Sequence, residues 1–155
     1  MKHKKGFTLI ELLVVVAIMG LLSAMAIVSL NNARARARDA RRLADVKQMQ
    51  TALELYFLDT YAYPADPANT VLDGKCLSDN GIEAVCTGAI TYMASLPDNP
   101  QPRTDGGCDN TSYTYKVDAG GGTKLSYHII YCLGHATGDL VASQHYATPA
   151  GLAEP

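Results

Sequence analysis

A run of apolar residues near the start of the chain restricts its fold more than any other feature. Residues 7–30 form a stretch of 24 in which Glu11 is the only charged side chain. As a helix this stretch would be about 36 Å long, which is enough to cross a bilayer. It is preceded by Lys2, Lys4 and Lys5. The sequence therefore predicts that this part of the chain enters a membrane.

Three interpretations of the apolar run are open. The first is an ordinary signal peptide with an A-x-A cleavage site at residues 24–26. The second is a plain membrane anchor, and the third is an anchor whose leader is removed before the run begins. A carboxylate at a central membrane position costs about 2.5–3.5 kcal/mol, and the first two interpretations give Glu11 no use. Glu11 therefore favours the third and marks a candidate functional residue that needs a partner.

Residues 31–61 are predicted to continue the same helix. They contain no Pro or Gly and are rich in residues of high helix propensity. Apolar side chains recur at steps of three and four, which gives one stripe to bury: Leu43, Val46, Met49, Leu53 and Tyr56. No helix breaker separates this stripe from the apolar run. The sequence predicts one helix of about fifty residues, which bends or loosens at Gly20 and ends before Pro64.

Residues 62–155 predict a loop-rich β domain. Residues 64–111 are rich in Pro, Gly, Asp and Asn, which indicates mostly loop, with a short helix near residues 90–96. The expected strands are residues 113–117 and 125–132, which form a hairpin, and a third within residues 140–146. A long N-terminal helix followed by a small antiparallel sheet is an α+β fold.

Four cysteines lie in the C-terminal half of the chain: Cys76, Cys86, Cys108 and Cys132. An even number of cysteines beyond a membrane or export signal indicates disulfides in an oxidising compartment. Three pairings can be drawn, and we favour Cys76–Cys86 with Cys108–Cys132 because each closes a short loop. The weaker alternative is a metal site, since the spacing of His128, Cys132 and His135 would also suit one.

The charges divide the chain into a basic segment and an acidic segment. The net charge is −2, but residues 31–60 carry a net +2 and residues 61–155 a net −6. The basic side chains near the membrane end are Arg34, Arg36, Arg38, Arg41 and Arg42. Counted alone, these arginines would hold the C-terminal side in the cytoplasm, whereas the cysteines place it outside. We give the cysteines more weight.

The N-terminal stretch KKGFTLIELLV, residues 4–14, closely resembles the class III signal of type IV pilins and type II secretion pseudopilins. The resemblance continues through the helix to Pro64 and is architectural beyond it. It implies that a prepilin peptidase cuts between Gly6 and Phe7 and methylates the new amino terminus at Phe7. A residue without a side chain before the cut allows the enzyme to approach the backbone closely.

The resemblance also implies a role for Glu11. Cleavage creates a charged amine at Phe7, and opposite charges attract strongly in a medium of low dielectric constant. In the family this glutamate meets the amine of a neighbouring subunit as the filament grows. The alternatives are that Glu11 pairs with the amine of its own chain or reaches the membrane interface.

The resemblance predicts four segments: a leader (1–6), a transmembrane and filament-core helix (7–30), an amphipathic helix (31–61) and a disulfide-bonded β head (62–155). It implies a structural filament subunit in the inner membrane, with its head outside the cytoplasm, that later joins a cell-surface or periplasmic filament. Its expected partners are other copies, prepilin peptidase, an inner-membrane assembly platform and membrane lipid. The alternative function is a secreted or anchored disulfide-bonded binding domain behind an ordinary signal peptide.

The sequence gives little support to nucleic-acid binding or catalysis. We expect no nucleic-acid partner, because four carboxylates share the helix with the arginines and no aromatic residues are interleaved with them. We expect no enzyme, because no motif supplies a histidine with a nucleophile. The arginines are candidates for contacts with acidic heads of neighbouring copies, and the alternatives are solvent or lipid headgroups.

A candidate calcium site lies in the loop before the hairpin. Its residues are Asp98, Asp105, Asp109 and Asn110, whose side chains offer the hard oxygen ligands that calcium prefers. Major pseudopilins carry a calcium site in a similar loop, so the resemblance supports this assignment. The family's ligands cannot be matched to these residues one by one, and turn formation is the role that we favour for Asp, Asn and Gly in such a loop.

Overall fold

The computed structural model describes residues 6–65, 70–109, 112–118 and 124–153. A single helix, α1 (Leu9–Thr60), spans 52 residues without interruption, as the sequence predicted. The chain divides into two compact units, residues 1–34 and residues 35–155, and α1 contributes to both. Tyr61, with a φ of 56°, leaves the helical conformation, and Pro64 follows three residues later.

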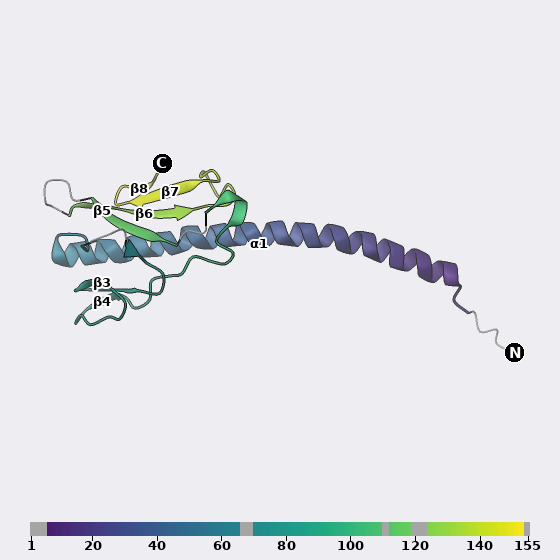
Figure 1. Ribbon diagram of the computed structural model, residues 1–155, viewed down its shortest axis with the longest axis horizontal. Helices are drawn as coiled ribbons and strands as arrows, with labels where there is room; N and C mark the ends of the chain where they lie inside the picture. The colour runs from purple at the N-terminus through teal and green to yellow at the C-terminus, as the bar shows by residue number, and fades with distance from the viewer. Residues whose placement is uncertain (1–5, 66–69, 110–111, 119–123, 154–155) are drawn as a thin grey trace. The chain divides into compact units, whose positions relative to one another are not determined.

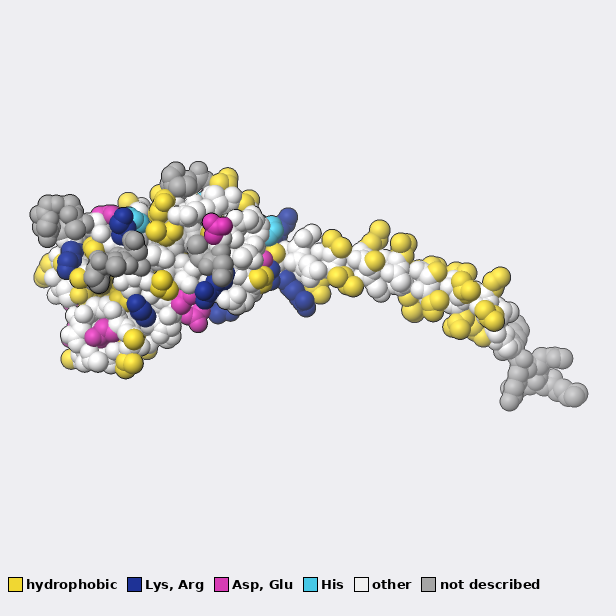
Figure 2. Space-filling model, viewed as in Figure 1, with side chains coloured by type: hydrophobic (Ala, Val, Ile, Leu, Met, Phe, Trp, Pro, Cys, Tyr) yellow, Lys and Arg dark blue, Asp and Glu magenta, His cyan; other side chains and the backbone are white. Residues whose placement is uncertain are grey.

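In the first unit every described residue from Gly6 to Arg34 is exposed. Figure 2 shows hydrophobic side chains along this part of α1. The helix is long and apolar enough to cross a membrane, with a mean hydropathy of 2.7 in its most apolar window. A helix that is apolar around its whole circumference needs lipid or protein around it.

In the second unit, two antiparallel sheets pack with α1. One sheet has the order β1-β5-β6-β7-β8 and the other the order β3-β2-β4. Figure 1 shows them on opposite sides of the helix. The strands are β1 (Thr70–Val71), β2 (Cys76–Ser78), β3 (Gly81–Glu83), β4 (Thr91–Met93), β5 (Thr114–Asp118), β6 (Ser126–Cys132), β7 (Gln144–Thr148) and β8 (Gly151–Ala153).

The core lies between the helix stripe and the inner faces of the sheets. From α1 it takes Val46, Met49, Leu53 and Tyr56, four of the five residues that the periodicity indicated. Burial alternates along β6, so that its tyrosines face inward. Buried tyrosine hydroxyls need acceptors, and α1 supplies them for two: Tyr113 donates to Asp45 over 3.2 Å and Tyr63 to Glu54 over 2.9 Å. The helix therefore offers this core both apolar surface and hydrogen-bond acceptors.

The predicted α+β class and the hairpin are confirmed. The hairpin is β5 paired with β6, and the third strand, β7, begins four residues later than the start of the predicted window. The short helix expected near residues 90–96 is wrong, because residues 91–93 pair with β2 as strand β4. The segment expected to be mostly loop also holds β1, β2 and β3, three short strands whose pairing no local signal shows.

Candidate functional site

The first turn of α1 gives Glu11 a partner in its own chain. Its Oε2 accepts hydrogen bonds from the backbone N–H of Thr8 over 2.9 Å and from the Thr8 hydroxyl over 2.7 Å. In return, the Glu11 N–H donates to Thr8 Oγ1 over 3.3 Å. This reciprocal arrangement is a capping box, which satisfies donors that the start of a helix otherwise leaves unpaired. Its T-x-x-E spacing is visible in the sequence at residues 8–11.

The bond between Gly6 and Phe7 lies just before this turn. Both residues are exposed and outside any helix or strand, and a Cβ added to Gly6 would meet no atom within 4 Å. Phe7 is 76% exposed. This peptide bond is therefore open to another protein, as cleavage there would require.

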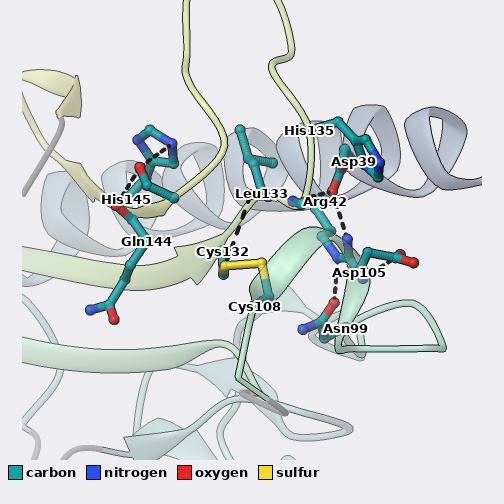
Figure 3. The surroundings of a disulfide bond; sticks show 12 residues. Asp39, Arg42, Asn99, Asp105, Cys108, Cys132, Leu133, His135, Gln144 and His145 are labelled. Carbon is teal, nitrogen blue, oxygen red and sulfur yellow. Dashed lines mark hydrogen bonds and ion pairs between the residues drawn. A yellow bond between two sulfur atoms is a disulfide. The ribbon is translucent and has the colours of Figure 1, made fainter.

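A second cluster of polar residues surrounds a fully buried arginine, Arg42 (Figure 3). Burying a guanidinium is costly unless its donors are satisfied. Its acceptors are Asp39 Oδ1 at 2.6 Å, Asn99 Oδ1 at 2.8 Å, the Pro102 carbonyl at 2.9 Å, and the Pro100 carbonyl and Asp105 Oδ2 at 3.2 Å. Arg42 thereby ties the loop of residues 99–105 to one turn of α1.

Arg38 completes this arrangement from one turn earlier on α1. Its Nε and Nη2 donate to the two oxygens of Asp105 over 2.6 and 2.7 Å, a bidentate pair. The hydrogen bond from Arg38 lowers the pKa of Asp105. Asp105 therefore lies between two arginines that stabilise its charged form.

Asp39 holds the segment that follows β6 to the same turn. Its Oδ1 accepts from the Gly134 N–H over 3.0 Å, and its Oδ2 lies 2.9 Å from His135 Nδ1. The backbones of Gly106 and Gly134 approach so closely that a Cβ on either would collide with the other segment. The loop of residues 99–105 and the segment that follows β6 thus meet at Asp39 and Arg42.

Two disulfides brace the second unit, Cys76–Cys86 and Cys108–Cys132, each with a Cα–Cα separation of 5.8 Å. This is the pairing that the sequence analysis favoured. The second bridge joins the two segments that meet over Asp39 (Figure 3). It also removes Cys132 from the metal site weighed above, whose histidines face Asp118 and Asp39 instead.

The five arginines separate into two groups. Arg38 and Arg42 pair with carboxylates within the chain. The other three, Arg34, Arg36 and Arg41, are exposed. The nearest carboxylate oxygen to Arg41 belongs to Asp45, at 3.9 Å, and the Arg41 side chain remains 70% exposed. These three are therefore the best placed of the five for the contacts with acidic heads that remain a hypothesis.

The calcium residues lie in different surroundings. Both oxygens of Asp105 face arginines, Asp98 and Asp109 are exposed, and Asn110 lies outside the described residues. Among the residues that the structure describes, no group of three or more His, Cys, Asp or Glu side chains could hold a metal ion. Calcium binding by this loop remains a prediction.

The calcium hypothesis makes a direct prediction about stability. A ligand held a hundredfold above its Kd stabilises the folded state by about 2.7 kcal/mol. Calcium should then raise the melting temperature of the full chain in detergent, and Asp109→Asn should remove the effect. Magnesium serves as the control. A melting temperature that calcium leaves unchanged would contradict the hypothesis.

Two adjacent arginines test the buried cluster. Arg42→Ala leaves Asp39 buried without its cation and should lower the free energy of unfolding by about 3–5 kcal/mol. Arg41→Ala, the matched control, removes an exposed side chain and should change it by less than about 0.5 kcal/mol. Urea unfolding in detergent, followed by near-UV circular dichroism of the tyrosines, measures both. Equal losses would show that the cluster does not stabilise the fold.

Comparison with known proteins gives one match for the N-terminus and several for the larger part of the chain. Residues 1–27 match the family model described as the prokaryotic N-terminal methylation motif. The chain is 31% identical over 103 residues to a type II secretion system core protein G of Vibrio cholerae, covering 66% of this chain and 57% of that protein. No solved structure gives a significant match.

Two fimbrial proteins are also similar. A type IV major fimbrial protein FimA of Dichelobacter nodosus is 50% identical over 98 residues, which cover 61% of this chain and 63% of that protein. A fimbrial protein of Pseudomonas aeruginosa is 35% identical over 108 residues, covering 62% and 70%. The chain thus spans less than two thirds of the Vibrio and Dichelobacter proteins.

Proposed function

Because the chain belongs to the family of type IV pilins and type II secretion pseudopilins, we propose that it is a structural subunit of a membrane-anchored filament. The observation that carries the proposal is the first part of α1. Every described residue from Gly6 to Arg34 is exposed, and nearly all side chains up to Leu30 are apolar. Such a surface is stable in a bilayer before assembly and against the same surface of other copies after it.

Processing precedes assembly in this proposal. Prepilin peptidase removes residues 1–6, and with them Lys2, Lys4 and Lys5, and the amine of Phe7 becomes the new terminus. Methylation of that amine keeps its positive charge. The accessible Gly6–Phe7 bond and the match to the methylation motif support this step.

The capping box suggests how Glu11 acts. In the chain that still carries its leader, Thr8 occupies the carboxylate with neutral donors. After cleavage a charged amine competes for it, and a charge-assisted hydrogen bond is about twice as strong as a neutral one. Glu11 would therefore exchange a local partner for the amine of Phe7, in its own chain or in a neighbour.

The proposed location follows from the disulfides and the apolar helix. Residues 7–30 anchor the subunit in the inner membrane, and the disulfide-bonded second unit lies outside the cytoplasm. The partners are other copies of the chain, prepilin peptidase, the inner-membrane assembly platform and membrane lipid. The filament is then periplasmic or extends from the cell surface.

The mature N-terminus tests processing. Mass spectrometry should find methylated Phe7 as the first residue. Gly6→Val, which adds a branched side chain next to the cut, should leave residues 1–6 attached in more than nine tenths of the molecules. Gly20→Val, the matched control in the apolar run, should be cleaved normally. A terminus at Ile27 would instead establish the signal-peptide alternative.

Glu11→Gln tests assembly separately from processing. The amide keeps the size of the side chain and can still accept from Thr8, but it has no charge to attract an amine. We expect methyl-Phe7 at the wild-type level and at least tenfold less protein in sedimentable filaments. Wild-type filament yield from this variant would show that the charge is not needed.

A further inference from the structure

In the second unit, α1 keeps one face free of the sheets. Its residues recur at steps of three and four, so they lie along one side of the helix. We call it the open face, and it consists of Ala37, Ala40, Arg41, Ala44, Gln48, Thr51, Leu55 and Leu58, all exposed. The core residues of α1 lie on the other sides of the helix.

The two halves of the open face differ in chemistry. The earlier half, residues 37–44, presents small alanines and the cation of Arg41. The later half, residues 48–58, presents Leu55 and Leu58, which are 48% and 67% exposed. With Tyr92 and Met93 of β4, Leu55 lines a groove beside the helix. One half is therefore flat and basic, and the other is a leucine ridge beside a groove.

The groove has an acidic edge. Asp59 accepts a hydrogen bond from the Tyr92 hydroxyl over 2.7 Å. This bond is the largest cause of a rise in the pKa of Tyr92 to about 12, and burial and the charges of Asp59 and Asp79 add to it. Within the described part of the chain neither carboxylate forms an ion pair. The acidic edge thus lacks a cation, while Arg41 projects from the other half.

We propose that the later half of the open face on one copy binds the earlier half of the open face on a second copy. This inference rests on the proposed function, because it names the contact through which filament subunits meet. Leu55 packs over Ala40 and Ala44 of the second copy, where small side chains allow two helices to approach closely. Arg41 of the second copy then lies about five residues, or roughly 7.5 Å, along the axis from the level of Asp59, so its long side chain extends toward the acidic edge and gives the contact complementary charges.

This contact repeats without closing on itself. Each copy uses its leucine half for one neighbour and keeps its alanine half for another, and such heterologous contacts generate open helical assemblies unless the rotation closes a ring. Placing Leu55 level with the gap between Ala40 and Ala44 shifts parallel helices by about 13 residues, or roughly 20 Å. A symmetric contact of leucine with leucine would leave Arg41 and the acidic edge unmatched.

Cross-linking between two tagged copies tests this contact. Full-length chains carrying Leu55→Cys with one tag and Ala40→Cys with another are co-expressed in cells that assemble the filament. A short bismaleimide then joins free thiols, and the native cysteines do not compete because all four are in disulfides. We expect a cross-linked dimer that carries both tags, at least tenfold more abundant than the dimer from Leu55→Cys alone.

Two results would overturn the inference and leave the proposed function intact. They are normal filaments without the mixed dimer, and a dimer formed by Leu55→Cys alone, which indicates a symmetric contact. A wild-type chain that forms no filaments and keeps its leader would instead overturn the proposed function. The two failures are therefore distinguishable.

A bulky substitution on the flat half gives an independent measurement. Ala40→Leu retains high helix propensity but fills the space that Leu55 of the neighbour needs. We expect at least tenfold less sedimentable filament with an unchanged melting temperature. Ala136→Leu, an exposed alanine outside α1, is the matched control and should assemble like the wild type. Wild-type assembly of Ala40→Leu would contradict the proposed packing.

Discussion

The buried guanidinium of Arg42 is the interaction on which the arrangement of loops in the second unit depends. A cation in a core is tolerated only where acceptors surround it. One turn of α1 supplies Asp39, and a loop some sixty residues later supplies Asn99, Asp105 and two carbonyls. These segments must therefore converge on that turn. A disulfide, Cys108–Cys132, joins the chain just after that loop covalently to the end of β6. The two backbones also pack closely where Gly106 meets Gly134.

The same helix serves two environments. Up to Leu30 its side chains are apolar on every side, which suits lipid or other helices, whereas from Val46 onward one stripe is buried by sheets. In each part, polar side chains form hydrogen bonds that the helix start or the packed core requires. Thr8 and Glu11 satisfy donors at its start, and Asp45 and Glu54 accept from core tyrosines. Each of these side chains on α1 therefore has a hydrogen-bond partner that accounts for its position.

Neighbouring arginines of α1 in the second unit lie in different surroundings. Arginines that look alike in the sequence have separate roles, since Arg42 is buried and Arg41 projects into solvent. In the proposed filament, the side of α1 that no sheet covers would bind neighbouring copies. The amphipathic half of the helix would thus contribute to assembly together with the apolar half.

Features that depend on residues close together in the chain could be predicted from the sequence. The long helix follows from propensity and the absence of breakers, and the β5–β6 hairpin from alternation around a turn. Short loops favoured one of three disulfide pairings without excluding the other two. The capping box was equally local, since its T-x-x-E spacing can be read directly. The roles of Arg38 and Arg42 and the strand at residues 91–93 became apparent only in the folded chain. Both depend on partners distant in sequence, Asp105 for Arg38 and β2 for β4, and no local pattern specifies which distant segment will pack against a given side chain.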